Sequence, residues 1–246
     1  RVAYKLGIDH LVLNFTEFFE KDVIDYFAAQ YEAGLTPNPY IACNRHIKFD
    51  AMLRRARELD FDSVATGHYA VIEQNAAGRW LLRKAPASKD QSYVLYSFTQ
   101  DQLSHTLMPL GEYTKPQARA LAEEAGLPVA HKPDSQEICF VENKDYAGFI
   151  ERYTGKMAPQ GNFVDTHGKI LGRHRGITHY TIGQRKGLGV SFGKPMYVTK
   201  IDTVHNEVTL GEEGSQYRTS LVAADLNFIP FDTLETEMDI TAKVRY

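Results

Sequence analysis

The side chains best suited to covalent chemistry in this 246-residue sequence are its two cysteines, Cys43 and Cys139. Cys43 stands beside Asn44, directly before a predicted helix over residues 45–59 whose N-terminal dipole would favour a thiolate. Cys139 follows a polar run with turn chemistry at residues 132–137. A thiolate and a second cysteine able to carry or attack a sulfur are what persulfide or thiol–disulfide chemistry requires. Two inert buried thiols in a reducing cytosol, or one structural disulfide in a secreted protein, are the alternatives.

Two polar segments are candidates for contact with a nucleotide or a nucleic acid. Residues 66–69, Thr-Gly-His-Tyr, follow a predicted strand, which is where open α/β sheets bind ligands. Gly67 would let a backbone approach a base or ribose closely. His68 could donate to a phosphate or a base, although a lone histidine in a loop is more often simply solvated. Residues 88–93 form a dense polar cluster that composition alone describes as an ordinary loop.

These residues must be positioned by an alternation of strands and helices over residues 1–150. Short strands are predicted at residues 9–15 and 62–66, and Gly7 stops a last helical turn. Apolar spacing and capping signals predict four groups of helical residues: the stripe Phe19, Val23, Tyr26 and Phe27; a helix over 45–59 capped by Asn44, with Phe49, Leu53 and Ala56 inside; helices from Thr99 and Thr114; and a helix with Tyr146, Phe149, Ile150 and Tyr153. The alternation predicts an α/β domain with a parallel sheet.

The amino-acid composition of the sequence changes near Gly155. Residues 152–200 contain nine of the 18 glycines and nine Lys or Arg against one acid, Asp165, so this segment carries +8 while the whole chain carries −3. A solvated basic surface and a phosphate-contacting patch are the two interpretations. A hairpin is predicted from residue 196 to 210. We therefore predict a catalytic α/β domain at 1–150, a small, mainly β domain at 151–212, and the start of a β-barrel at 213–246.

Composition limits the class of protein. Apolar residues make up 43% and charged residues 24%, as in ordinary soluble proteins, and no apolar run is long enough to cross a bilayer. The sequence opens at Arg1 and closes on an alternating segment at 240–246. Both ends read as cut from the middle of elements, so the expectation is an internal piece of a longer cytoplasmic, monomeric protein.

Five blocks occur together in a fixed order along the chain. They are Thr36-Pro37-Asn38-Pro39 with Cys43-Asn44 and Ile47-Lys48-Phe49; Ala65 to Tyr69; Lys89 to Tyr93; Asp134-Ser135 with Ile138-Cys139-Phe140; and Gly183 to Gly189. In this order they resemble the tRNA-specific 2-thiouridylase family over essentially the whole chain. The resemblance implies an adenine-nucleotide-hydrolase-like α/β domain that makes 2-thiouridine at the wobble position of tRNA.

The same resemblance implies roles for individual residues. Cys43 matches the nucleophile that attacks the activated carbon or releases the sulfur, and Cys139 matches the cysteine that carries the persulfide. A disulfide between them is implied at turnover or at rest. Gly67 matches a nucleotide-binding position. The tRNA-contacting positions are Asn38, Pro39, Tyr40, His68, Lys89, Asp90, Gln91, Arg245 and Tyr246. Tyr40 stands where many members carry an acidic residue, and its ring could stack on the target base.

The implied partners are ATP with Mg²⁺, tRNA, and a sulfur carrier protein or desulfurase that donates a persulfide; no metal ligands and no tightly bound cofactor are predicted. The family's Ser-Gly-Gly-x-Asp-Ser ATP loop does not occur in the sequence and would lie upstream of Arg1. The chain alone is therefore expected to be inactive in adenylation. Alternatives are a non-catalytic tRNA-binding fragment, or a related ATP pyrophosphatase acting on a small molecule. A redox protein is disfavoured because the cysteines lie 96 positions apart.

Overall fold

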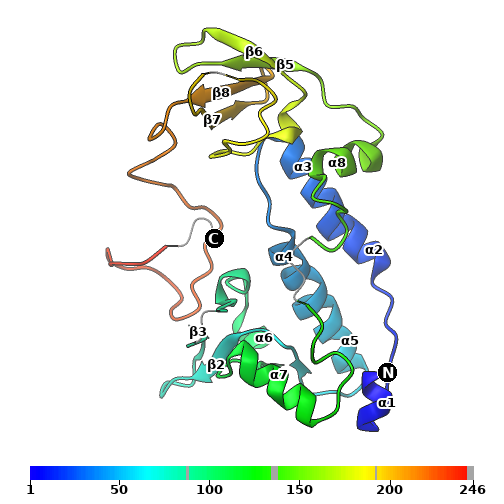
Figure 1. The fold of residues 1–246 in the computed structure, drawn as a ribbon. Helices are drawn as coiled ribbons and strands as arrows, with labels where there is room; N and C mark the ends of the chain where they lie inside the picture. The colour runs from blue at the N-terminus through cyan, green and yellow to red at the C-terminus, as the bar shows by residue number, and fades with distance from the viewer. Residues whose placement is uncertain (87–88, 134–137, 192, 243–246) are drawn as a thin grey trace. The chain divides into compact units, whose positions relative to one another are not determined.

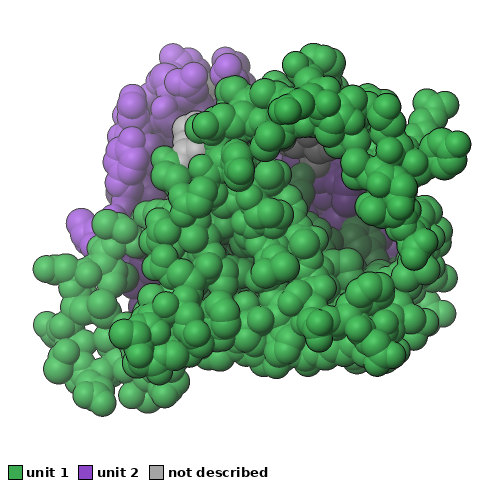
Figure 2. All heavy atoms as spheres, turned by 90° about the horizontal axis from the view of Figure 1, so that it is seen from below, with its two compact units in different colours: residues 1–22, 40–134, 224–246 green, residues 23–39, 135–223 purple. Residues whose placement is uncertain are grey.

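A computed structural model describes residues 1–86, 89–133, 138–191 and 193–242. The chain divides into two compact units, coloured separately in Figure 2. Unit 1 comprises residues 1–22, 40–134 and 224–246, and unit 2 comprises residues 23–39 and 135–223. None of the helices that the described residues form is long and apolar enough to cross a membrane.

Unit 1 is built from short helices and two pairs of strands (Figure 1). Strands β1 (Val64–Ala65) and β4 (Thr106–Leu107) pair in parallel, and β2 (Ala70–Gln74) and β3 (Trp80–Lys84) form an antiparallel hairpin. Its core contains Phe49, Leu95, Phe98 and Leu103, all at most 3% exposed. The parallel pair confirms the predicted α/β class. The helical segments of this region are α1 (Val2–Leu6), α2 (Thr16–Phe19), α4 (Pro39–Ala42), η2 (Cys43–Ala51), α5 (Met52–Glu58), η3 (Ser92–Val94), α6 (Gln100–Ser104) and α7 (Lys115–Glu124).

The capping signals predicted at Gly7, Thr99 and Thr114 are confirmed. Thr99 and Thr114 each cap a helix, α6 and α7, and each completes a capping box with the glutamine three residues later, Gln102 or Gln117. Gly7 follows α1 in the left-handed conformation, with φ 66°. These signals succeed because their hydrogen bonds join residues that are close in the sequence.

The helix predicted over 45–59 begins earlier than expected. Segments α4, η2 and α5 run consecutively from Pro39 to Glu58, and the residues from Cys43 to Ala51 form a π-helix. The expectation that Asn44 caps a helix is therefore wrong, because Asn44 lies inside the helical run. Proline is well suited to a first helical position, since its missing N–H would have no intrahelical partner there. Cys43 consequently lies inside the helical run rather than in front of it.

The stripe predicted to start at Phe19 is also displaced. A π-helix, η1 (Glu20–Asp25), separates α2 from α3 (Tyr26–Glu32). Val23 and Phe27 are fully buried as predicted, but Tyr26 is exposed and the inner face continues through Ala28 and Tyr31. A π-helix bonds residue i to i+5, and one additional residue turns a helical face by about 100°.

Two predicted β segments contain no strand among the residues that the structure describes. Residues 9–15 form no strand, and they are mostly exposed. An apolar run becomes a strand only when a neighbour satisfies its backbone, and no strand pairing among the described residues includes this one. The described residues 213–242 contain no strand either; Asn227 instead donates to the Tyr96 and Phe98 carbonyls. The start of a barrel at 213–246 remains a prediction.

Unit 2 contains helix α3, helix α8 (Tyr146–Thr154), the 3₁₀ turn η4 (Ile177–His179) and a four-stranded sheet in the order β6-β5-β8-β7. The strands are β5 (Gly161–Val164), β6 (Ile170–His174), β7 (Tyr197–Asp202) and β8 (Glu207–Gly211). The predicted hairpin is β7–β8. Phe163, Tyr180, Val198 and Val208 form the sheet's core. Phe27, Val141 and Ile150 belong to a second core.

Candidate functional site

Cys43 is the first residue of the π-helix η2, and its side chain is half-buried. The next residue fixes the helix from inside the core of unit 1. Asn44 is 2% exposed, and its Nδ2 donates to the Val94 carbonyl at 3.1 Å. Its Oδ1 is buried and has no hydrogen-bond partner among the described residues. Because a buried amide that loses its partner is costly, this bond sets the rotation of the helix that presents Cys43.

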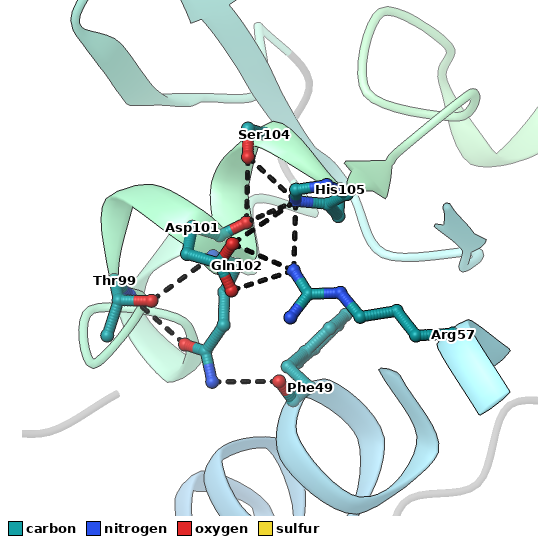
Figure 3. Close-up of polar contacts among 7 residues, drawn as sticks. All are labelled: Phe49, Arg57, Thr99, Asp101, Gln102, Ser104 and His105. Atoms are coloured by element: carbon teal, nitrogen blue, oxygen red, sulfur yellow. Dashed lines mark hydrogen bonds and ion pairs between the residues drawn. The ribbon is translucent and has the colours of Figure 1, made fainter. Parts of the chain in front are cut away.

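A second polar group holds the same helix against α6 (Figure 3). The Gln102 side chain has two roles: its Oε1 accepts from the Thr99 N–H at 3.0 Å, and its Nε2 donates to the Phe49 carbonyl at 2.7 Å. Phe49 lies in η2, where the π-helix departs from the ordinary ladder of hydrogen bonds. Further along, Arg57 on α5 bonds Asp101 on α6 at 2.8 Å. Gln102, which completes the capping box of α6, thus also fixes the Cys43 helix.

The loop after β1 places the His68 ring against the same helix. The His68 ring lies 5.7 Å from the Phe49 ring, and its Nδ1 is 2.9 Å from the Thr66 hydroxyl. Burial, with a smaller contribution from the charge of Lys48, lowers the pKa of His68 to about 4. The imidazole is therefore neutral at physiological pH. When the Thr66 hydroxyl donates to Nδ1, Nε2 carries the proton and can donate to a ligand oxygen.

Gly67 leaves its backbone accessible. It is exposed, and a methyl group placed on it would be 3.7 Å from the nearest neighbour, Leu110 Cδ1. The space above this turn, at the carboxyl end of β1, fits the approach of a nucleotide base or ribose.

Two of the three polar residues predicted in the loop after residue 88 shape the loop itself. Gln91 bonds Tyr69 twice, since its N–H donates to the Tyr69 carbonyl at 2.8 Å and its Oε1 accepts from the Tyr69 N–H at 3.0 Å. The Asp90 carboxylate accepts from the N–H groups of Ala85 and Ser92 and from the Ser92 hydroxyl. Lys89 is exposed. The loop is therefore tied to the segment that carries His68.

A cation that the sequence did not single out lies at the same place. Lys115 Nζ is 5.8 Å from the centre of the Tyr69 ring. Lys115 follows the capping residue of α7, and no spacing in the sequence connects it to Tyr69. Lys48, part of the Ile47-Lys48-Phe49 motif, also acts on His68 through its charge. The structure thus brings Cys43's helix, His68, Gln91 and further lysines together within unit 1.

The remaining predicted residues are placed as follows. Tyr40 is 39% exposed, Asn38 is half-buried and Pro39 is buried. Cys139 is exposed between Ile138 and Phe140, which pack on the Phe27 core of unit 2. The two cysteines are not joined by a disulfide. Residues 134–137, Arg245 and Tyr246 lie outside the described residues. No group of three or more His, Cys, Asp or Glu side chains in the described ranges is arranged to hold a metal ion.

Two family models match consecutive parts of the chain and define its class of protein. Residues 1–143 match the family model described as "tRNA methyl transferase HUP domain", and residues 147–212 match the one described as "tRNA methyl transferase PRC-barrel domain". The chain is thus a nucleotide-binding α/β domain followed by a PRC-barrel domain.

Curated relatives define the family. Over the whole chain, which covers 69% of each relative, it is 53% identical to the tRNA-specific 2-thiouridylase MnmA of Clostridioides difficile and 57% identical to that of Acetivibrio thermocellus. The MnmA of Clostridium acetobutylicum is 52% identical over the same share. The chain belongs to the tRNA-specific 2-thiouridylase family.

Proposed function

We propose that this protein transfers sulfur to the wobble uridine of tRNA to form 2-thiouridine, in an ATP-dependent reaction. The observation that carries the proposal is the placement of Cys43. In a member of this family, a half-buried thiol lies on a helix fixed by Asn44 and Gln102, and the His68 loop packs on the same helix. Such a site can hold a reacting base against a nucleophile.

Activation of the base makes the substitution feasible. The uridine O2 is a poor leaving group; when it attacks the α-phosphate of ATP, pyrophosphate departs and the oxygen becomes part of a leaving AMP. The open backbone at Gly67 would contact the nucleotide, and the neutral His68 would donate a hydrogen bond to a base or phosphate oxygen. Mg²⁺ would accompany ATP and neutralise its phosphate charge. Tyr40, exposed on α4, would stack on the extruded base.

Sulfur would enter through Cys139, which is accessible to a sulfur carrier protein or desulfurase. The terminal sulfur of a Cys139 persulfide attacks C2 and AMP leaves. The Cys43 thiolate then attacks Cys139 Sγ and breaks the bond between this atom and the sulfur on C2. The products are 2-thiouridine and a Cys43–Cys139 disulfide. A thiol reductant restores both thiols. Direct attack of Cys43 on the activated carbon before sulfur delivery is the alternative order.

The test is made in cells that carry the corresponding gene. Total tRNA is digested and 2-thiouridine is measured by mass spectrometry, with protein levels checked by blotting. We expect wild type to make the nucleoside and both Cys43→Ser and Cys139→Ser to lose it. Absence of 2-thiouridine in the wild type would contradict the function, whereas its persistence in either variant would contradict the role assigned to that cysteine.

A further proposal concerns the isolated 246-residue chain. Since it contains no Ser-Gly-Gly-x-Asp-Ser loop, we propose that it binds tRNA as a cytoplasmic monomer but does not adenylate it. Incubation with α-labelled ATP and tRNA should give no labelled tRNA and no pyrophosphate. Labelled tRNA would contradict this. Binding that falls steeply with salt would favour tRNA over a small-molecule substrate.

A further inference from the structure

We propose that the loop Gly183–Gly189 of unit 2 is a binding site for the sugar–phosphate backbone of RNA. The proposal rests on the proposed function, because tRNA is the RNA that this protein would handle. It extends that function by locating a phosphate contact in the glycine-rich module (residues 152–200), on residues that are not among those predicted to hold the target base.

The loop is pinned on both sides. Tyr180 and Leu188, 2% and 6% exposed, enter the core of the four-stranded sheet before and after its tip. The Gly183 N–H donates to the Val198 carbonyl at 2.7 Å, and the Val198 N–H donates to the Gln184 carbonyl at 3.0 Å. The first residues of the loop are therefore fixed against β7.

The Gln184 side chain sets the shape of the loop from inside. Its Oε1 accepts from the Thr181 N–H at 3.0 Å, and its Nε2 donates to the Lys186 carbonyl at 3.0 Å. One half-buried amide thus joins the two limbs of the loop. A preorganised loop loses less entropy when it binds a ligand.

The two cations at the tip are available to a ligand. Arg185 and Lys186 are exposed and have no carboxylate partner in the part of the chain that the structure describes. Three other cations of the same module are neutralised: Lys194 pairs with Glu212, Lys200 with Asp202 and Arg152 with Asp145.

The backbone beside these cations is also unpaired. Across the described ranges, the N–H groups from Arg185 to Gly189 have no hydrogen-bond acceptor. Gly187 and Gly189 have φ of 76° and 77°, a conformation that lets neighbouring N–H groups form an anion-binding concavity. Backbone donors combined with Arg and Lys suit phosphate oxygens, whereas an acidic protein surface needs only the side-chain charges. The loop therefore favours an RNA backbone.

The test measures binding of an unmodified tRNA transcript by fluorescence anisotropy over a range of salt concentrations. In Arg185→Ala/Lys186→Ala we expect about tenfold weaker binding and a plot of log affinity against log salt that is shallower by about two. Lys194→Ala/Lys200→Ala, which removes two paired charges from the same module, is the matched control and should stay within about twofold of wild type. Arg185→Lys/Lys186→Arg should retain binding.

A Gln184→Ala variant separates shape from charge. Both cations remain, so binding should weaken by about two- to fivefold with the salt slope unchanged. Wild-type affinity in Arg185→Ala/Lys186→Ala would overturn the inference, as would an equal loss in the control. Loss of sulfur transfer with tRNA binding intact would overturn it too and point to a protein partner. Failure of wild type to bind tRNA would instead contradict the proposed function.

Discussion

The helix that carries Cys43 and the turn that carries Cys139 present their thiols in different ways. Cys43 is half-buried on a helical run whose next residue, Asn44, is bonded inside the core. Cys139 is exposed, and only its flanking residues Ile138 and Phe140 pack on apolar neighbours. A thiol that must attack one atom of a bound base needs a fixed direction, while a thiol that must meet a protein donor needs access. The two settings suit the two proposed roles.

The largest effect is expected from the core beneath the Cys139 turn. Phe27 is fully buried, and its ring makes edge contacts with Tyr31 at 4.9 Å and Phe140 at 5.3 Å. Phe27→Ala should destabilise unit 2 by about 3–5 kcal/mol because it leaves a cavity. Hydrogen exchange of the α8 amides measures this loss. Phe18→Ala, at a ring that is 46% exposed, is the control and should cost far less.

The same variant sharpens the contrast between the thiols. Phe27→Ala should change the alkylation rate of Cys139 more than that of Cys43, because it removes the packing of Phe140 beside Cys139. Equal changes at both thiols would show that the anchoring of the Cys139 turn is not local.

The next effect is expected at Asn44. Asn44→Ala leaves the Val94 carbonyl without its donor in the core, which should cost about 1–3 kcal/mol and increase the alkylation rate of Cys43. Asn162→Ala is the control, since the bond that the Asn162 side chain accepts from Arg173 is long, at 3.5 Å. If Asn44→Ala leaves the exchange of η2 amides unchanged, Asn44 does not fix the Cys43 helix.

This contrast also explains what the sequence could predict. The helix caps at Thr99 and Thr114, the β7–β8 hairpin and the glycine after α1 were predictable because each depends on bonds between near neighbours. The cysteines, Gly67 and His68 were found by residue type and family resemblance. The short polar runs drew attention to Asp90 and Gln91, but only the structure shows that both side chains bond within their own loop.

The errors share a different cause. Residues 9–15 were expected to pair with a strand that the described residues do not provide. A π-helix leaves no signal in apolar spacing, so the face of Tyr26 was misplaced. The position of Asn44 was misplaced because the helical run already begins at Pro39. The contact between Lys115 and Tyr69 joins two distant segments and has no counterpart in local sequence.

A smaller loss of stability is expected at Gln102, where the capping of α6 can be separated from the bond to the Cys43 helix. Gln102 and Gln117 occupy equivalent positions in two capping boxes, but only Gln102 also donates to the Phe49 carbonyl. Gln102→Glu keeps the acceptor for Thr99 and removes that donor, so it should cost about 1–2 kcal/mol. Gln117→Glu should be nearly neutral. If urea unfolding shows the same loss of unfolding free energy in both variants, the bond from Gln102 to the Phe49 carbonyl does not stabilise the Cys43 helix.

The last prediction concerns the pKa of His68, which reports how far water is excluded from the ring beside the Cys43 helix. Burial lowers the pKa of His68 to about 4, below its value in an unfolded chain. As the pH falls below about 6.5 the unfolded chain takes up the proton first, so folding stability decreases down to about pH 4, by about 3 kcal/mol in all. His68→Gln should remove this part of the pH dependence, and NMR titration of the imidazole measures the pKa directly.

Lys48→Ala identifies which cause dominates the titration of His68. Desolvation is the larger cause and the Lys48 charge the smaller one, so the pKa should rise only slightly in this variant and stay well below 6.5. A return to the ordinary histidine value would mean that the lysine, rather than burial against Phe49, keeps the ring neutral. In that case the Cys43 helix would be as open to water as the Cys139 turn, and the division of roles between the two thiols would need another physical basis.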